Sequence, residues 1–327
     1  MHPLLLVSLP FLVLPAPAHT ACECGHLITS TNDFFTHRLL TRFTPPNTST
    51  NSTLLATWEP QTWLVPGNLT QLTVSRRNEA ANVFLSAGGL TLRQRGWDGK
   101  GPVSAAELHS IRDNFLFGSF RMRGVVRGGE GAVAGFFVYY DDSEESDVEI
   151  VTRDADGGRW VHYTNHPAYD PNTDTLTPNA TFKDLLAKPW WEMQEHRLDW
   201  TAETTKFWQD GVLKRTISKN VPSHPGKVMI NLWANNGSWS GQPSSIDVTL
   251  EIEYVDLYFN TSESNEGRDE AWNRACETAK GKKDAHCEVG AEGVSENRAA
   301  ARSGGARIMK RVWTAVLGAG LVIGRWL

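Results

Sequence analysis

The sequence predicts an all-β fold, an antiparallel sandwich, for the stretch from about residue 25 to 262. Strand-like runs of alternating or aromatic-rich residues recur along this stretch, with Gly, Asp and Asn between them. Long amphipathic helical patterns are absent from it. Many short strands without a regular alternation of strand and helix favour two packed antiparallel sheets.

Two local patterns make the strand prediction specific. In "FWQDGVLKR" the pair Asp210-Gly211 suits the type I′ turn of a β-hairpin. In "IDVTLEIEYVDLYF" the apolar residues alternate as far as Ile252, and the alternation resumes in the other phase at Val255. A shift of phase within one strand predicts a β-bulge.

The first residues, 1–21, are predicted to be a secretory signal peptide. The apolar run "PLLLVSLPFLVLPAPAHTA" ends in small residues, and cleavage is expected after Ala18 or Ala21. Prolines in the run argue against a buried helix. We therefore expect a secreted protein with a β-sandwich at 22–262, a charged, small-residue-rich segment at 263–306 and a hydrophobic tail at 307–327.

The cysteines and the glycosylation sequons fit secretion. The cysteines lie near the ends of the mature chain, where disulfides can clamp its two ends, and all three pairings stay open: Cys22, Cys24, Cys276 and Cys287. The run "DEAWNRACETAK" between them predicts a short helix. Sequons for N-glycans start at Asn47, Asn51, Asn68, Asn179, Asn236 and Asn260.

The C-terminal tail predicts attachment to a membrane. The apolar stretch from Val312 to Leu327 is interrupted by Arg325 and is shorter than the ~20 residues that span a bilayer. With Ser303-Gly304 and Gly305 before it, it resembles a lipid-anchor addition signal. The alternatives are a plain membrane tail and a frayed peptide. An anchor would place the protein at the cell surface or cell wall.

Composition excludes some classes of function. The formal net charge is -5 and no domain is basic, so nucleic acid is not an expected partner. No cluster of residues has the spacing of metal ligands, and we expect no metal and no other cofactor. We also expect a monomer.

The segment "EESDVEI" holds the candidate catalytic residues. On a β-strand, Glu145, Asp147 and Glu149 share one face, and Glu144 lies on the other. Neighbouring carboxylates repel, so the arrangement costs free energy. One explanation is a charged edge strand that blocks aggregation. The other is glycoside hydrolysis, in which a retaining enzyme holds two carboxyls about 5–5.5 Å apart. Four residues of straight strand span ~13 Å, so this hypothesis also requires a bent strand and a concave cleft.

Blocks in four places resemble glycoside hydrolase family 16, the laminarinase and lichenase group. The first three are "SAAELHSIRDNFLFGSFRMRGVV", "EESDVEI" and "HRLDWTAETTKFWQDGVLKR", and the last is "VMINLWANNGSWSGQP". The resemblance implies a concanavalin A-like β-jelly roll with a substrate cleft, in a secreted member of fungal type. It implies that Glu145 is the nucleophile, Glu149 the general acid/base and Asp147 a helper. Where the family often has Ile or Leu, this chain has Ser146, which predicts looser packing beneath the nucleophile.

Aromatic and polar residues near these blocks are candidates for sugar binding, because pyranose rings pack on flat aromatic faces. We expect Trp200 and Trp208 in the core. The cleft candidates, with His162 as a hydrogen-bond donor to a sugar, are Trp239, Trp233, Asn231, His162 and Trp160.

Three functions remain open at this point. The first is a secreted retaining endo-β-glucanase that cleaves internal bonds of a β-1,3(4)-glucan. The second is a cell-wall transglycosylase with the same fold and site. The third is a glucan-binding, lectin-like module without catalysis, which the intact set of acids argues against.

Overall fold

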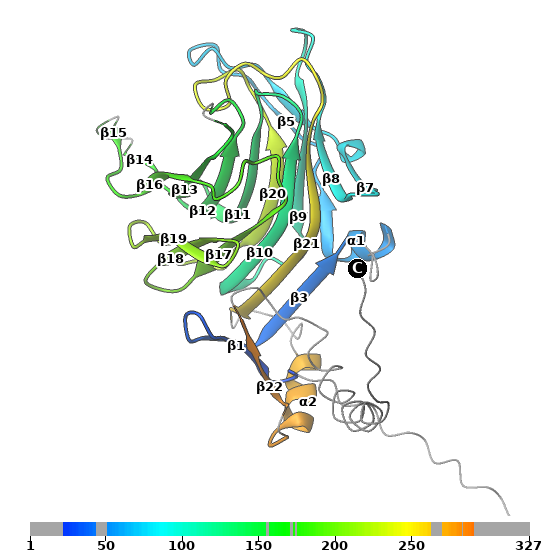
Figure 1. The fold of residues 1–327 in the computed structure, drawn as a ribbon, viewed down its shortest axis with the longest axis vertical. Helices are drawn as coiled ribbons and strands as arrows, with labels where there is room; N and C mark the ends of the chain where they lie inside the picture. Colours follow the sequence, from blue (N-terminus) through cyan, green and yellow to red (C-terminus); the bar gives the residue numbers. More distant parts are fainter. Residues whose placement is uncertain are drawn as a thin grey trace, which may run out of the picture.

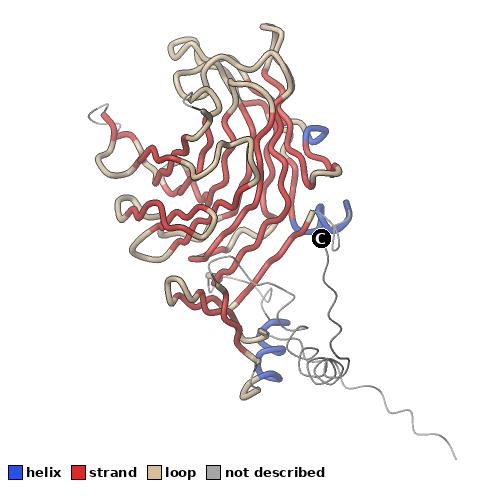
Figure 2. The backbone as a smooth tube through the Cα atoms, viewed as in Figure 1, coloured by secondary structure: helices blue, strands red, loops and turns tan. Residues whose placement is uncertain are grey.

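The computed structural model describes residues 22–43, 51–154, 157–170, 173, 175–262, 270–282 and 284–290. Strands dominate these residues, and two large sheets pack face to face (Figures 1 and 2). The all-β prediction is therefore confirmed. The predicted signal peptide, the hydrophobic tail and Asn47 lie outside the described residues.

One large sheet, here called the front sheet, holds the acidic strand near its middle. Its neighbours pair antiparallel except for β6 and β9, which are parallel. β4 (Trp58–Pro60) adds to β9, and the other strands follow the order β16 (Thr181–Leu185), β13 (Trp160–Asn165), β12 (Glu144–Val151), β11 (Val133–Asp141), β20 (Lys227–Trp233), β9 (Val103–Ser110), β6 (Arg76–Asn78) and β5 (Leu64–Val65).

The second large sheet, the back sheet, is antiparallel throughout. β3 (His37–Arg42) adds to β21, and the other strands follow the order β19 (Val212–Ile217), β18 (Thr205–Gln209), β17 (Gln194–Trp200), β10 (Phe115–Arg127), β21 (Val248–Thr261), β8 (Gly89–Gln94) and β7 (Val83–Ser86).

Both local predictions for this sheet are confirmed. Asp210 and Gly211, between β18 and β19, have φ angles of 43° and 78°, as a type I′ turn requires. Opposite β10 the register steps from Tyr254 to Ile252, which leaves Glu253 as the bulged residue of β21. The bulge lets β21 keep apolar side chains in the core on both sides of the break.

The remaining elements lie at the margins of the sandwich (Figure 1). They are α1 (Asn51–Thr57), the 3-10 turn η1 (Ala80–Asn82), the hairpin of β14 (Tyr169–Asp170) and β15 (Thr175–Leu176), and a terminal unit of β1 (Gly25–Ile28), β2 (Asp33–Phe35), α2 (Glu270–Ala279) and β22 (His286–Val289). The expected short helix is thus present as α2. In the part of the chain that the structure describes, no helix is long and apolar enough to cross a membrane.

The hydrophobic core lies between the front and back sheets. Phe136 of β11 and Ile230 of β20 face Phe120 of β10 and Leu257 of β21, all within one buried cluster. Full burial of such a side chain contributes roughly 1.5–3 kcal/mol. Trp200 and Trp208 are both buried, which confirms the expectation that they belong to the core.

The outer face of the back sheet is unusual because it buries charge. Arg197 and Asp199 are each 1% exposed, and Arg197 Nη2 lies 2.6 Å from Asp199 Oδ2. The terminal unit covers them: Arg197 Nη2 donates to Ser30 Oγ at 3.0 Å, and Arg121 Nη2 donates to the carbonyl of Gly290 at 3.2 Å. Arg197 and Asp199 both belong to β17, so these two hydrogen bonds, and not the ion pair, tie the terminal unit to the sandwich.

The disulfides join the two ends of the described chain. Cys22 pairs with Cys287 and Cys24 with Cys276, which is one of the two pairings that join the ends among the three left open by the sequence. Strand β22 then pairs parallel with β1, from Gly25 opposite His286 to Ile28 opposite Val289. Helix α2 and strand β22 are thereby fixed beside the sandwich.

We expect the bond between Cys24 and Cys276 to stabilise the terminal unit. The double variant Cys24→Ser with Cys276→Ser should lower the free energy of unfolding by about 2–4 kcal/mol, because the unfolded chain regains the freedom of a long loop. Urea unfolding of the oxidised protein measures this, with the double variant Cys22→Ser and Cys287→Ser for comparison. Unchanged midpoints in both variants would contradict the clamp.

Candidate active site

A cleft of about 960 Å³ opens on the face of the front sheet that points away from the core. Its floor comes from β12, β11 and β20, and its walls come from β9, β6 and the segments that follow β13 and β20. The lining residues include Glu145, Asp147, Glu149, Phe137, Tyr139, Met229, Asn231, Trp233, Trp239, Arg76, Glu107, His109, Trp63, Thr164, His166, Tyr169, Leu176 and Thr181.

Strand β12 presents its acids to this cleft. Glu145, Asp147 and Glu149, here called the acid trio, all line it. The alternate residues Val148 and Ile150 are buried in the core between the sheets. The alternation of side chains along β12 thus places the acids in the cleft and the apolar residues in the core, as the sequence predicts.

Glu144 is turned away from the cleft. Its carboxylate accepts hydrogen bonds from the backbone N–H and the hydroxyl of Ser223, and Nδ1 of His224 lies 3.1 Å from it. Glu144 is thus occupied in joining β12 to the loop before β20. This position leaves Glu145 as the first carboxyl of the segment that faces the cleft.

The residue beneath the trio is anchored. Ser146 is fully buried, and its hydroxyl donates to Asn165 Oδ1 at 2.8 Å. Thr205 Oγ1 donates to the same oxygen at 2.9 Å, and Asn165 Nδ2 donates to the carbonyl of Lys219. The expectation of looser packing at Ser146 is wrong, because a satisfied polar network replaces the apolar contact there.

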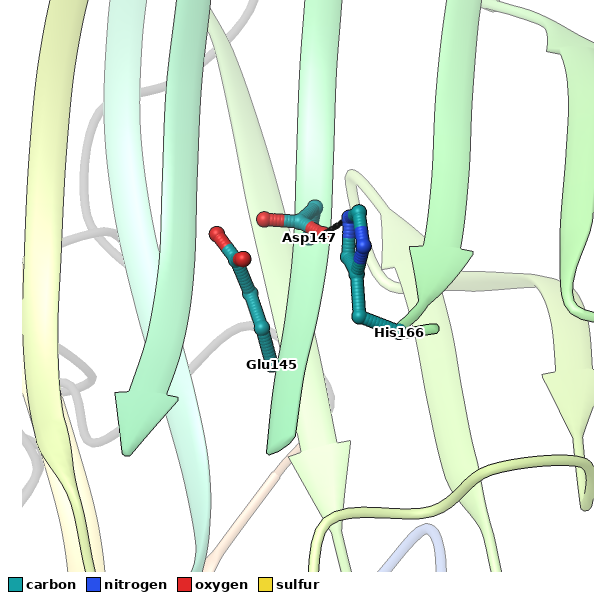
Figure 3. Close-up of side chains that lie close together, drawn as sticks. All are labelled: Glu145, Asp147 and His166. Atoms are coloured by element: carbon teal, nitrogen blue, oxygen red, sulfur yellow. Dashed lines mark ion pairs between the residues drawn. The ribbon is translucent and has the colours of Figure 1, made fainter. Parts of the chain in front are cut away.

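His166 is a residue of the site that the sequence analysis missed. Its Nε2 lies 3.2 Å from Asp147 Oδ2, and its backbone N–H donates to the carbonyl of Glu145 at 2.9 Å. Figure 3 shows the imidazole beside Asp147, with Glu145 on the other side of that carboxyl. A histidine directly after the strand that pairs with β12 is the signal that could have identified it.

The acid trio holds protons at neutral pH. Burial first, and the charge of Asp147 second, raise the pKa of Glu145 to about 10. Burial also raises the pKa of Asp147 well above its ordinary value, and the charge of Glu149 adds to this effect. Because Glu145 and Asp147 are hydrogen-bonded to each other and cannot both ionise cheaply, they share a proton.

Glu149 has the environment of a proton donor. Burial, followed by the charge of Glu145, raises its pKa to about 7. The charges of His166 and Arg76 and a hydrogen bond from Trp239 act in the opposite direction. The indole N–H of Trp239 donates to Glu149 Oε2 at 3.1 Å. Glu149 can therefore give up a proton at near-neutral pH and take it back.

The cleft beside Glu149 contains polar atoms without partners. Gly135 of β11 lies between Glu149 and Asn231 in the sheet, and a Cβ there would come within 2.6 Å of Asn231 Oδ1. Among the described residues, Asn231 Oδ1 and Arg76 Nε find no hydrogen-bond partner. The guanidinium of Arg76 lies over the ring of Trp233 at 4.3 Å. This combination of an aromatic face with unpaired polar atoms suits a sugar ring and its hydroxyls.

A second polar group on the same wall was also missed. Glu107 and His109 of β9 are both buried, and His109 Nε2 lies 2.7 Å from Glu107 Oε1. Asn78 Nδ2 donates to Glu107 Oε2 at 3.1 Å, and the ring of Trp63 lies edge-on to His109. These residues come together because β6 pairs with β9, a contact that the spacing of the sequence does not reveal.

Most of the predicted sugar ligands reach the cleft, but His162 and Trp160 do not line it. Trp239, Trp233 and Asn231 are all part of the lining. His162 is buried behind Trp239, and its Nε2 lies 2.7 Å from Asp154 Oδ2. Trp160 is covered by Lys183, whose Nζ lies 4.7 Å from its ring centroid.

The candidate glycosylation sites differ in exposure. Asn68, Asn179 and Asn236 are exposed. Asn260 is half-buried, and its Oδ1 accepts hydrogen bonds from the backbone N–H and hydroxyl of Thr36. Asn51 begins α1. The exposed asparagines leave room for a glycan, whereas a glycan on Asn260 would displace the contact with Thr36.

Glu145, Asp147 and His166 also have the spacing of metal ligands, since one oxygen or nitrogen atom of each lies within 4.8 Å of the others. Two of these residues are carboxyls that hold a shared proton, which a cation would have to displace. The expectation that the protein needs no metal stays a prediction.

The proton on Glu149 should make the protein less stable as the pH rises. An unfolded glutamate loses its proton near pH 4.5, whereas the folded residue keeps it to about pH 7. The folded state therefore binds more protons between these values, so its stability falls across that window, by up to about 3 kcal/mol. Glu149→Gln should remove much of this fall and be the more stable protein at pH 8.

Urea unfolding at pH 4 and pH 8 measures the effect. Glu144→Gln is the control, because that carboxyl lies outside the cleft and the pKa of Glu144 is lowered. Parallel curves of stability against pH for the wild type and Glu149→Gln would show that Glu149 is not a buried proton-holding group.

Two carboxyls on one strand face of a cleft are the groups through which retaining enzymes act on glycosidic bonds. The model of glycosyl hydrolases family 16 matches residues 54–255. The chain belongs to this family.

Curated relatives share part of their length with the chain. A beta-glucanase of Paenibacillus polymyxa is 29% identical over 136 residues, which cover 39% of this chain and 53% of that protein. The Crh-like protein CRH11 of Candida albicans is 29% identical over 144 residues, 42% of this chain and 30% of that protein. The chain thus spans about half of the first relative and less of the second.

A solved structure shares the fold. The beta-glucanase of Bacillus licheniformis has a TM-score of 0.54 with this chain at 18% identity, covering 68% of this chain and 98% of that one. The predicted jelly-roll sandwich is confirmed.

Proposed function

We propose that the protein is a retaining glycosidase that cleaves internal bonds of a β-1,3(4)-glucan-type polysaccharide. The observation that supports this most strongly is the acid trio on the cleft face of β12, with the pKa of Glu149 raised to about 7. Such a value suits a residue that must act first as an acid and then as a base. Curated relatives named beta-glucanase support the class of substrate.

In the first step Glu149 gives its proton to the glycosidic oxygen while a carboxylate oxygen of Glu145 attacks the anomeric carbon. The bond to the leaving sugar breaks, and a covalent glycosyl ester forms on Glu145. In the second step Glu149, now ionised, takes a proton from water or from a sugar hydroxyl. That oxygen attacks the anomeric carbon and Glu145 leaves as a carboxylate.

Asp147 and His166 prepare Glu145 for this attack. Glu145 must be ionised to act as a nucleophile, so the proton that it shares with Asp147 must lie on Asp147. Asp147 has Glu145 on one side and His166 Nε2, at 3.2 Å, on the other. A protonated Asp147 then donates a hydrogen bond to the Glu145 carboxylate.

Recognition of the glucan is assigned to the two walls of the cleft. Trp239, Trp233 and Asn231 contact sugar beside Glu149, and Glu107 with His109 continues the polar wall. Beyond His166 the wall consists of Tyr169, Leu176 and Thr181. One wall thus offers many polar partners and the other offers a more apolar surface.

A second candidate function is transglycosylation to another polysaccharide. Tyr169 and Leu176 face each other across the β14–β15 hairpin, line the cleft and are 49% and 68% exposed. An exposed apolar surface beside the acids could hold an acceptor chain, which competes with water for the ester on Glu145.

Secretion and attachment to the cell surface belong to the same proposal. The disulfides of the terminal unit suit an oxidising compartment, and the exposed sequons suit passage through a secretory route. We propose that the protein is extracellular, acts as a monomer and is held at the cell wall or membrane by its C-terminal tail.

The test is incubation of the protein with a panel of β-glucans and chito-oligosaccharides, with and without a labelled acceptor oligosaccharide. Hydrolysis gives shortened products, and transfer gives products of the summed mass that carry the label. Binding to a glucan in a pull-down, with no turnover of any substrate, would instead support a lectin-like module.

A further inference from the structure

We propose that Asp154 and His162 are positioning residues that aim the indole N–H of Trp239 at Glu149. This inference deepens the proposed function, because it concerns the residue assigned there as the general acid/base. It gives His162 a role different from that of a sugar ligand.

The contacts form one continuous row behind the cleft. Trp239 Nε1 donates to Glu149 Oε2 at 3.1 Å. The ring of His162 stands edge-on to the ring of Trp239, with centroids 4.5 Å apart and an interplanar angle of 66°. His162 Nε2 lies 2.7 Å from Asp154 Oδ2. Each side chain is thus held by the next, from Asp154 to Glu149.

His162 is placed to support Trp239 and is not placed to contact sugar. It is 8% exposed and absent from the lining of the cleft, whereas Trp239 lines it. The Asp154 carboxylate accepts from Nε2, which fixes the plane of the imidazole. The ring can then act as a rigid wall for the indole, which would otherwise choose among several rotamers.

Asp154 is itself fixed. Lys183 Nζ lies 2.9 Å from the same Oδ2 that faces His162, and the backbone N–H of Asp154 donates to the carbonyl of Val151 at 3.0 Å. Asp154 lies just after the turn that follows β12, the strand that carries Glu149. Glu149 and Asp154 thus belong to β12 and the segment that follows it, and His162 lies on β13, which pairs with β12.

The loop that carries Trp239 is also tied to its surroundings. Ser240 Oγ accepts a hydrogen bond from the backbone N–H of Asn235 at 3.0 Å, and Gly241 N–H donates to the carbonyl of Gly237 at 2.9 Å. These bonds fix the backbone of the loop but leave the indole free to turn about its side-chain torsions. The contact with His162 restricts that remaining freedom.

The chemical consequence concerns the proton on Glu149. An N–H donor stabilises the ionised carboxylate, so the Trp239 hydrogen bond lowers the pKa of Glu149 against the effect of burial. Without an aimed donor, Glu149 would keep its proton to higher pH. It would then be a weaker acid in the first step, and the alkaline limb of the activity profile would move upward.

Other charged groups face the same residues and stay in place in the test. Around Glu149 they are Glu145 and Asp147 on β12, His166 after β13, and Arg76 on β6. Around His162 they are Asp154, Arg153 and Lys183. Burial lowers the pKa of His162, so the imidazole is neutral at neutral pH and adds no charge to Glu149.

The experiment measures kcat/KM against pH in four variants. It compares the pH at which kcat/KM falls to half on the alkaline side, here called the alkaline limb. Trp239→Phe keeps a ring and removes the donor, and it should move the limb upward by about one pH unit, a tenfold change in the ionisation constant. Asp154→Ala should move it in the same direction by less. Asp154→Asn keeps an acceptor for His162 and should restore the limb. The double variant Asp154→Ala with Trp239→Phe should move it no further than Trp239→Phe alone.

His196→Gln is the control for a change that only lowers stability, because His196 is also buried but lies on β17 of the back sheet. It should alter stability without moving the limb. A limb that moves in Trp239→Phe but stays fixed in Asp154→Ala would overturn the positioning role. Additive shifts in the double variant would also overturn it.

A second readout does not need turnover. Carboxyl carbon NMR of protein labelled at glutamate follows the titration of Glu149, with Glu149→Gln used to assign its signal. The pKa of Glu149 measured in this way should rise among the variants in the same order as the alkaline limb. If the protein turned over no glucan but the shifts appeared, the proposed function would fail and this inference would stand.

Discussion

Glu145→Gln should reduce turnover of any good glucan substrate by a factor of about 10⁴ or more and leave the protein folded. The amide has the size of the carboxyl but cannot form the glycosyl ester. The fold should survive because Glu145 contributes a buried proton-holding group and no part of the core. Initial rates on a soluble β-glucan, with circular dichroism and urea unfolding as controls, measure the two effects.

Glu144→Gln is the matched control for this variant. Glu144 is adjacent in sequence but bonds to Ser223 on the other side of the strand. It should keep most of the wild-type activity. If Glu145→Gln retained more than a few per cent of activity, or if Glu144→Gln lost as much as Glu145→Gln, the assignment of the nucleophile would be wrong.

Glu149→Gln should lower activity on natural glucans by about 10²–10⁴-fold, the usual contribution of a general acid or base. The loss should be small for the first step on an aryl glycoside, because that leaving group departs without a proton. The ester on Glu145 should then accumulate, since no base remains to activate water. Azide needs no general base, so adding it should restore turnover of the aryl substrate.

The azide product identifies the site of attack. A β-glycosyl azide is expected, because azide displaces Glu145 from the face that Glu149 normally serves. Rescue should be absent in Glu145→Gln with the same substrate and the same azide concentration. An α-azide from Glu149→Gln, or no rescue at any concentration, would contradict the assigned roles.

Local patterns in the sequence were sufficient for much of the fold and for the acid strand. The turn at Asp210 and the bulge at Glu253 depend on a few adjacent residues, and both are present. Which side chains of β12 share a face could be predicted directly, because side chains alternate along any strand. The position of Trp239 and Asn231 on the cleft follows from the resemblance of their block to a known family.

The rest of the site depends on contacts between distant segments. Glu107 and Asn78 meet because β6 pairs with β9, and His166 reaches Asp147 because the chain turns directly after β13. His162 shows that the alternation of side chains along a strand does not by itself predict which residues line the cleft. It lies on the same face of β13 as Thr164, which lines the cleft, but Trp239 covers it.

The terminal unit illustrates the same limit at longer range. The pairing of Cys22 with Cys287 spans 265 residues, and no local pattern could select it. The composition change after Ser262 is visible in the sequence. The return of β22 to pair with β1 is a tertiary contact that composition does not predict.

The measurement that tests the central claim most directly is the configuration of the first product, seen by proton NMR in the first minutes of hydrolysis, before mutarotation. Glu145 and Glu149 lie on one strand face with Asp147 between them, so we expect two successive displacements at the anomeric carbon, the first by Glu145 and the second by water that Glu149 activates. Two displacements retain the configuration of the substrate, so the β-anomer should appear first. An α-anomer that appears first would mean a single displacement by water, and would contradict the role of Glu145 as nucleophile.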